Sequence, residues 1–355
     1  MLDRRHFTRG LLAASAASLA ASSVRAATPD LPSTIRFGDV GFGFGAPFGE
    51  GTAAIADAKG FIADEFAGTN VKTEFTYFIG TGPAINEAIS NRQLDFASYG
   101  AVPNVIGKAN GLPTTILASY GGTNIYAAVR PDLPIASVAD LKGRKIAVQK
   151  ATIIHWGLVR ALEAHGIDQK DVTILDLKNA DQLAALAAKS VDAVFGASFL
   201  LPLVDKGIAK IVYRSRDLGP RGQGFGAFLV TQDFAKTYPE ATQRVVRGFV
   251  RAAAWLADPN NRDEAFQIWS RTGTPPELYA RNFEGQAFAE TFSPLLDDFF
   301  VDRYRSVVDF AQENRLIRRG FDVPSFFDRS HVDRAVADLK LASLWPPRRA
   351  DGTTN

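Results

Sequence analysis

The sequence predicts an α/β protein of two lobes, each built around a mostly parallel sheet that helices cover on both faces. The chain has 355 residues, of which 46% are hydrophobic and 22% charged, as in a soluble globular protein with room for two cores. Strand and helix patterns alternate from residue 34 to residue 215, which is typical of parallel sheets. In two stretches, "LDFASYGA" (94–101) and "VDAVFGA" (191–197), an apolar residue and an Asp lead into a strand that ends at Gly-Ala. This shared pattern indicates two similar units.

The first unit is expected to hold three strand–helix pairs and a further strand. Predicted strands lie at 34–40, 71–78, 94–100 and 114–121, and the second alternates polar and apolar residues with period two. One helix follows the glycine-rich loop 41–51 and ends near Phe66. Another begins at "GTGP" (80–83), with Ile85 and Ile89 on one face, and a short one begins near Pro103, since proline suits a first helical turn.

The second unit repeats this alternation. Predicted strands lie at 145–149, 172–177 and 191–197, and predicted helices at 150–166 and 179–190. After Phe228 the pattern is mostly helical, and these helices are expected to cover the first lobe. The polar end of the chain, 345–355, is expected to be frayed.

Two glycine-rich segments, 119–129 and 219–230, are expected to cross between the lobes. The first lobe would then comprise 34–121 and 226–345, and the second 122–225. Glycines at both crossings would permit hinge motion, although ordinary surface loops have the same composition.

The first 26 residues resemble a twin-arginine export signal that is removed after Ala26. They hold Arg4 and Arg5, a Phe two positions later, a short Ala/Ser-diluted apolar run and "VRA" before Ala27. Without them the chain has 36 basic and 37 acidic residues, a balance that does not favour a nucleic-acid partner. With no cysteine, disulfides and lipid anchoring are excluded, so we expect a soluble periplasmic protein.

Catalytic and metal chemistry finds little support in the sequence. The chain has no cysteine, and His155, His165 and His331 do not stand at metal-ligand spacing. Nucleophile-elbow and phosphate-loop motifs are absent, and the glycines of 41–49 do not fit a dinucleotide fingerprint. We therefore expect no catalytic residue, no metal and no cofactor.

Uncharged helix beginnings are the remaining candidates for a site. They follow strands after Phe44, at 81–83, at 100–103 and at 151–153. In a parallel sheet the strand ends that lead to helices share one edge, so four helix N-termini could meet in one cleft and bind an anion. Ordinary strand–helix turns are the alternative at any single position. Nearby aromatic residues suggest a ligand with an apolar body: Phe42, Phe44, Phe48, Tyr99, Tyr120, Tyr126, Trp156 and Phe199.

Several stretches resemble the periplasmic binding proteins of sulfonate, taurine and nitrate ABC importers. They are "DAKGFIADEF", "FIGTGPAINEAISNRQLDFASYGAVPN", "SVADLKGRKIAVQKATIIHWGLVRALEAHGI" and "AFLVTQDFAKTYPEATQRVVRGFVRA", and the likeness runs from about Ile35 to Leu344. The resemblance implies a two-lobed type II periplasmic binding protein fold. It also implies a monomer that delivers a small anionic organic ligand to an ABC permease and its ATPase. The resemblance extends to a branch of the same fold that contains thiamine-pyrimidine-precursor binders and biosynthetic enzymes, so a binding protein or an enzyme of that branch is the alternative.

Helix beginnings, small hydroxyl groups and aromatic side chains together define the expected ligand site. The resemblance places anion contacts at 80–83, 100–103 and 151–153. The expected ligand-binding residues are Phe44, Gly80, Thr81, Gly82, Tyr99, Ala101, Val102, Thr123, Thr152, Ile153, Trp156 and Ser198.

The ligand's head group stays open at this stage. Many relatives carry a Trp-Asp-Pro-type sequence after the strand that begins "DA", where this chain has Ala197-Ser198-Phe199. An acid there would suit the amine of taurine, so we expect taurine to bind more weakly than an alkyl- or arylsulfonate. We rank an organic sulfonate first, a nitrogenous heterocycle second and nitrate third. Glu50 is the one carboxylate noted near the first loop, which disfavours a metal-assisted bicarbonate site. A sensor for a membrane receptor would share the fold and the export signal.

Overall fold

The computed structural model describes residues 31–42 and 47–354. These residues belong to one compact unit, Leu31–Asn355. The expected export signal, residues 1–26, and the predicted ligand residue Phe44 lie outside the described residues.

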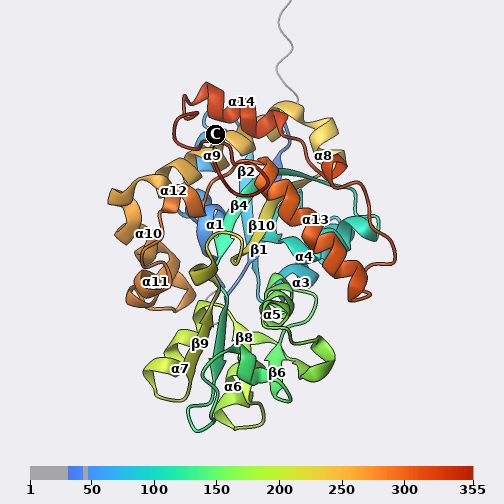
Figure 1. The fold of residues 1–355 in the computed structure, drawn as a ribbon. Helices are drawn as coiled ribbons and strands as arrows, with labels where there is room; N and C mark the ends of the chain where they lie inside the picture. Colours follow the sequence, from blue (N-terminus) through green and yellow to red (C-terminus); the bar gives the residue numbers. More distant parts are fainter. Residues whose placement is uncertain (1–30, 43–46, 355) are drawn as a thin grey trace, which may run out of the picture. The chain divides into compact units, whose positions relative to one another are not determined.

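The strands of the described chain form two five-stranded sheets (Figure 1). The first sheet has the order β2-β1-β3-β10-β4 and the second has the order β7-β6-β8-β5-β9. The strands are β1 (Thr34–Val40), β2 (Lys72–Phe78), β3 (Phe96–Gly100), β4 (Thr114–Thr123), β5 (Tyr126–Val129), β6 (Lys145–Val148), β7 (Thr173–Asp176), β8 (Ala193–Gly196), β9 (Lys210–Arg214) and β10 (Gly224–Thr231).

Each sheet contains one strand that runs against the others. In the first sheet β1 pairs parallel with β2 and β3, whereas β10 is antiparallel to β3 and β4. In the second, β6 pairs parallel with β7 and β8, whereas β5 is antiparallel to β8 and β9. The reversed strand is the fourth in both orders. It is also the strand by which the chain enters the second sheet (β5) or returns to the first (β10). The predicted fold class, two mostly parallel α/β lobes with two crossovers, is confirmed.

Helices connect the strands and cover the sheets, and after β10 the described chain is helical (Figure 1). The helices are α1 (Gly51–Ala58), α2 (Phe61–Asp64), α3 (Thr81–Ser90), α4 (Ala101–Ala109), α5 (Ile153–Ala164), α6 (Asn179–Ala187), α7 (Leu201–Asp205), α8 (Gln232–Thr237), α9 (Pro239–Ala257), α10 (Arg262–Trp269), α11 (Pro276–Asn282), α12 (Phe288–Thr291), α13 (Asp298–Glu313) and α14 (Ser330–Asp338). Among the described helices, none is long and apolar enough to cross a membrane.

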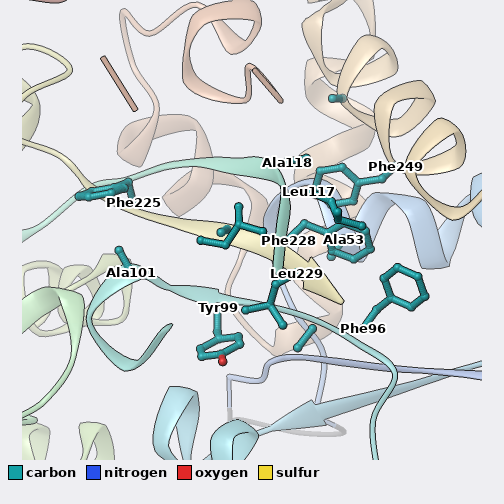
Figure 2. Packing of buried hydrophobic residues seen from close by; sticks show 14 of the residues in the cluster. Ala53, Phe96, Tyr99, Ala101, Leu117, Ala118, Phe225, Phe228, Leu229 and Phe249 are labelled. Atoms are coloured by element: carbon teal, nitrogen blue, oxygen red, sulfur yellow. The ribbon is translucent and has the colours of Figure 1, made fainter. Parts of the chain in front are cut away.

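The core of the first sheet depends on aromatic side chains of β3, β10 and α9. Figure 2 shows Phe96, Phe228 and Phe249 among the buried residues of this core. Phe228 stacks on Phe249 with ring centroids 4.3 Å apart and lies 5.5 Å from Phe96. The long helix α9 is thereby fixed to the sheet, as the sequence predicts for the C-terminal helices. The second sheet has its own buried clusters, which include Ile146 and Val194.

The C-terminal segment is ordered against the first core, and the expectation of a frayed end was wrong. Trp345 is 3% exposed and belongs to the first core. The Arg348 Nε donates to the buried carboxylate of Asp297 at 2.8 Å. A buried aromatic side chain and a buried ion-pair partner outweigh the polar composition of the tail.

The two crossing segments are held together by close packing and by an amide network. The Gln223 Nε2 donates to the Asn124 Oδ1 at 2.9 Å, which links the second crossing to the first. Gly121 has a φ of +109°, and a Cβ there would lie 2.6 Å from the carbonyl oxygen of Thr291. These contacts explain the glycines of both segments by tight packing as well as by conformational freedom.

We predict that Gly226→Ala destabilises the protein by about 1–3 kcal/mol, because a Cβ at Gly226 would meet the Tyr120 ring at 2.1 Å and the Tyr99 carbonyl oxygen at 2.3 Å. Urea unfolding measures the loss. Gly224→Ala, in the same strand, is the matched control, since its nearest contact would be 3.3 Å. Equal stability of the two variants would contradict the packing argument.

Candidate functional site

A cavity lies where helices that follow strands of both sheets begin. Its volume is about 130 Å³, several times the roughly 30 Å³ that one water occupies in the liquid. Its walls include the ends of β1 and β8, the first crossing segment and the region between α11 and α13. The space suits a small organic molecule.

The first turns of five helices within the described chain contribute to the cavity wall. The lining residues at these helix beginnings are Gly51 and Thr52 (α1), Thr81 and Gly82 (α3), Gly100 and Pro103 (α4), Thr152 and Ile153 (α5), and Asn179 and Gln182 (α6). All four helix beginnings considered from the sequence contribute, and α1 begins at Gly51, at the end of the glycine-rich loop 41–51. The beginning of α6 was missed, and the same strand–helix rule could have found it. Helix N-termini carry partial positive charge, so their convergence favours an anion.

Thr81, at the start of α3, has an unusual backbone conformation. Its φ is +59°, in the left-handed region that β-branched residues avoid. The Gln149 Nε2, which follows β6 of the second sheet, donates to the Thr81 Oγ1 at 3.2 Å. Ala151, just before α5, also has a positive φ, +58°. Positive φ values at Thr81 and Ala151 are therefore found at or just before the first turns of α3 and α5, two helices whose beginnings line the cavity.

Thr152 caps α5 and its hydroxyl is already engaged. The Thr152 Oγ1 donates to the carbonyl oxygen of Gln149 at 2.7 Å and accepts from the His155 backbone N–H at 3.4 Å. The hydroxyl therefore orients the loop after β6 and the first turn of α5. Its role at the cavity is to hold these two segments in place.

The glycines at the start of α3 and before α4 allow close approach. A Cβ on Gly82 would lie 2.2 Å from the Pro103 Cγ, and one on Gly100 would lie 3.2 Å from the Ile153 Cγ2. Gly82 therefore lets α3 lie against α4, and Gly100 lets the end of β3 approach α5 of the second sheet. Larger side chains would push apart the helix beginnings that line the cavity.

Half of the twelve predicted ligand residues line this cavity: Thr81, Gly82, Thr123, Thr152, Ile153 and Ser198. Five of the others are not among the residues that line this cavity: Gly80, Tyr99, Ala101, Val102 and Trp156. The twelfth, Phe44, is outside the described residues.

The displaced residues have structural roles. Tyr99 is buried in the core of the first sheet (Figure 2), and its hydroxyl donates to the Asn86 Oδ1 at 2.7 Å. Ala101 and Val102 are fully buried on α4. Trp156 is 4% exposed and meets the Phe225 ring edge-on at 5.9 Å. All four side chains are buried, that of Tyr99 on β3 and those of the other three residues on the inner faces of α4 and α5, although these residues are close to helix beginnings that line the cavity.

Several lining residues were not anticipated, and they come from the C-terminal half. Asn282, Phe283 and Phe292 reach the cavity from the ends of α11 and α12. The Asn124 Nδ2 donates to the Asn282 carbonyl oxygen at 2.7 Å, so the first crossing is fixed to the end of α11. No periodic pattern or motif in the sequence marks these positions, because they meet the cavity only through tertiary packing.

The described lining contains no lysine or arginine, but it contains two carboxyl groups, those of Asp39 and Glu50. Burial raises the pKa of Glu50 to about 7. Burial also raises the pKa of Asp39 well above its ordinary value, and the neighbouring Glu50 and Asp57 add to the rise. The Asp39 Oδ1 accepts from the Val40 N–H at 2.8 Å, while its Oδ2 has no partner among the described residues. The cavity therefore offers protonated or weakly acidic carboxyl groups at its β1–α1 end.

The cavity wall contains carboxyl groups that could pair with the amine of a ligand such as taurine. Ser198 does line the cavity in place of an acid. However, Asp39 and Glu50 supply carboxyl groups from the other sheet. Glu50 is therefore joined by a second carboxyl group that the sequence argument did not weigh.

The chain resembles known proteins over most of its length. The family model described as NMT1/THI5 like matches residues 54–262. The chain belongs to the NMT1/THI5-like family. This NMT1/THI5-like chain is 27% identical over 288 residues to an aliphatic sulfonates-binding protein of Bacillus subtilis (strain 168), covering 80% of this chain and 84% of that protein.

Solved structures agree with this assignment. The periplasmic sulfonate-binding protein SsuA from Methylobacillus flagellatus KT superimposes with a TM-score of 0.80 at 27% identity, covering 91% of this chain and 99% of that one. The alkanesulfonate-binding protein SsuA from Xanthomonas axonopodis pv. citri, bound to MOPS, gives 0.69 at 23% identity over 84% of this chain and 99% of that one, which shows the fold alone. The resemblance inferred from the sequence is confirmed for this NMT1/THI5-like protein.

We predict that Glu50 by itself lowers the free energy of unfolding as pH rises from about 4.5 to about 7, because folded Glu50 keeps its proton to about pH 7 while the unfolded chain releases it near pH 4.5. Glu50→Gln should remove this loss, which is on the order of 3 kcal/mol. The variant should match the wild type at pH 4 and exceed it at pH 8 in urea unfolding. Glu87→Gln, on the exposed side of α3, is the control, and an unchanged pH slope in Glu50→Gln would contradict the assignment.

Proposed function

We propose that the protein is the solute-binding component of an ABC importer and that it captures an organic sulfonate in the cavity between its two sheets. The observation that carries this proposal is the meeting of five helix beginnings around a described cavity wall without lysine or arginine. Such a wall binds an anion through N–H dipoles and hydroxyl groups, each helix end contributing roughly 0.3–1 kcal/mol or more when buried. The sulfonate-binding relatives support the same ligand class.

The walls beside the helix beginnings suit the rest of such a ligand. Phe42, Phe195 and Phe199 line the cavity together with Phe283 and Phe292. Aromatic faces bury an alkyl or aryl group without asking for hydrogen bonds. In this arrangement the sulfonate oxygens lie at Thr81, Gly82, Thr152 and Ile153, and Thr123 and Ser198 add polar contacts at the wall.

The N-terminal residues bear on where in the cell the protein works. The arginine pair and the apolar run of residues 1–26 support export to the periplasm by the twin-arginine route. Lobes of 34–121 with 226–345 and of 122–225 would close on the ligand about the two crossing segments. The loaded monomer would then dock on a permease whose ATPase drives import, without acting as an enzyme.

A nitrogenous heterocycle is the second candidate. It is favoured by the carboxyl groups of Asp39 and Glu50 and by the side-chain amides of Asn124 and Gln149 at the wall. Carboxyl and amide groups hydrogen-bond the ring nitrogens of pyrimidines, whereas a plain alkylsulfonate has no use for them.

We expect butanesulfonate or an arylsulfonate to raise the melting temperature, while nitrate, bicarbonate and a pyrimidine do not. A ligand at about 100 times its dissociation constant stabilises by roughly 2.7 kcal/mol, a shift of several degrees. Thr81→Val should weaken sulfonate affinity roughly tenfold, since it removes the hydroxyl and keeps the shape. The buffer must itself be free of sulfonates.

Thr76→Val, on the exposed face of β2, is the matched control for this screen. A shift with the pyrimidine alone would transfer the function to the heterocycle and reject the sulfonate. Equal affinities of wild type and Thr81→Val would move the anion away from the start of α3.

Taurine provides a separate prediction, because its amine can pair with an ionised carboxylate. At pH 6, below the pKa of about 7 for Glu50, taurine should bind more weakly than butanesulfonate. Between pH 6 and pH 8 Glu50 ionises, so the taurine affinity should rise relative to butanesulfonate by roughly tenfold. Calorimetry of both ligands at the two pH values measures the ratio. Glu50→Gln should hold the ratio constant, and a ratio that changes equally in that variant would reject Glu50 as the cause.

A further inference from the structure

A buried arginine lies behind the crossing segments without a carboxylate partner. Arg303, on α13, is 7% exposed, and its guanidinium carbon lies 3.8 Å from the centroid of the Phe225 ring. One terminal nitrogen donates to the Gln223 carbonyl oxygen, while the Nε has no hydrogen-bond partner among the described residues. Burying a cation without an anion costs several kcal/mol, so the structure should contain or attract a counter-charge.

Two further arginines share this place. Arg348 and Arg303 both lie over the Phe299 ring, with guanidinium carbons 4.5 and 5.4 Å from its centroid. Arg216 reaches the same cavity and donates to the carbonyl oxygens at the end of α11, among them that of Asn282 at 3.1 Å. Burial and the charges of Arg348 and Arg221 lower the pKa of Arg303 to about 9. The charges of Arg348 and Arg303 thus repel one another, and an anion beside them would be stabilising.

The arginines border a cavity of about 270 Å³ that is distinct from the ligand cavity. Hydroxyl groups of Ser119 and Ser293 add polar atoms to its wall. Glu290, exposed on α12, is the one acid among its described lining residues. Arg348 pairs with Asp297 and Arg216 lies 3.6 Å from Glu284, so among the described residues the unpaired positive charge at this cavity is that of Arg303.

Arg348 has donors to spare for a ligand. Its Nε and its backbone N–H both go to the Asp297 carboxylate, at 2.8 and 3.1 Å. Its two terminal nitrogens make no hydrogen bond within the described chain. A guanidinium fork with free terminal nitrogens matches two oxygens of a tetrahedral oxyanion.

We propose that this second cavity, bordered by Arg216, Arg303 and Arg348, binds a small tetrahedral oxyanion. Gly122, of the first crossing, lines both this cavity and the ligand cavity. Gln223, of the second crossing, lines the second cavity and donates to Asn124 at the wall of the first. An anion in the second cavity and a ligand in the ligand cavity would therefore both contact the crossing segments. Their affinities are coupled, and the coupling, which rests on the proposed sulfonate function, is equal in both directions.

Calorimetric titration of the purified protein with sodium sulfate tests the site. The buffer is Tris chloride without sulfonates, and sodium chloride keeps the ionic strength constant, so that chloride serves as the non-specific anion. Saturating butanesulfonate occupies the ligand cavity during the titration. A saturable sulfate heat under these conditions is the expected result, and its absence would overturn the proposal.

Variants assign the heat to the second cavity. Arg348→Gln should weaken sulfate at least tenfold, and Glu290→Gln, an exposed change with little risk to folding, should tighten it severalfold because it removes a repelling charge. Arg334→Gln is the control, since Arg334 is exposed and contacts Asp338 at 3.6 Å. The assignment would be overturned if Glu290→Gln left the sulfate affinity unchanged and if Arg348→Gln and Arg334→Gln lowered it equally.

A further titration distinguishes failure of this inference from failure of the proposed function. Without butanesulfonate, Thr81→Val should leave the arginine-dependent sulfate affinity unchanged. If the protein binds no sulfonate at all, the sulfate result stands by itself and only the coupling is lost. If sulfonate binds and sulfate does not change its affinity, the coupling is rejected while both sites remain.

Discussion

The whole molecule depends on the pairing of its two crossing segments. β4 and β10 form a ladder that ends at Thr123 and Gly224, where the chain leaves for the second sheet and returns from it. Asn124 and Gln223 then join the segments side chain to side chain at 2.9 Å. This buried amide pair has no apolar substitute that would satisfy both partners, because the Asn124 amide also serves Asn282. This junction, together with the Gln149–Thr81 hydrogen bond and the packing of Gly100 on Ile153, joins the helix beginnings of the first sheet to those of the second.

Much of the fold could be predicted from the sequence, because local patterns determine it. The predicted strand "TIRFGDV" has the observed bounds, Thr34–Val40, and its apolar residues Ile35 and Phe37 alternate with Thr34 and Arg36 at the start of the strand. The Gly-Ala repeat of 94–101 and 191–197 identified β3 and β8, the central strands of the two sheets. The tail was misjudged because composition does not reveal that Trp345 and Arg348 have buried partners. Tertiary contacts decided that segment.

The candidate site could be predicted only in part, for a related reason. Chain order identifies which helices begin at a sheet edge, so Thr81 and Thr152 could be found from their place after a strand. It does not tell which side of a first turn faces the cavity, and Ala101 and Val102 turn inward to the core while Gly100 and Pro103 line the wall. Residues such as Phe283 come from helices that carry no strand–helix signal. The carboxyl group of Asp39 was overlooked because a strand-end acid looks like an ordinary surface residue.

Charge is separated across the crossing segments, and this separation governs what the ligand cavity can select. Among the described residues, the carboxyl groups of Asp39 and Glu50 line the ligand cavity, here called the front cavity. The arginines Arg216, Arg303 and Arg348 line the second cavity, and Gly122 of the first crossing segment lines both. A bare anion in the front cavity therefore finds dipoles and no ion pair, and its binding free energy must come largely from burial of an apolar body. Nitrate and bicarbonate have no such body, whereas an alkyl- or arylsulfonate does. We therefore expect the front cavity to select by the length and character of the ligand's tail, with a cationic tail favoured only when Glu50 is ionised.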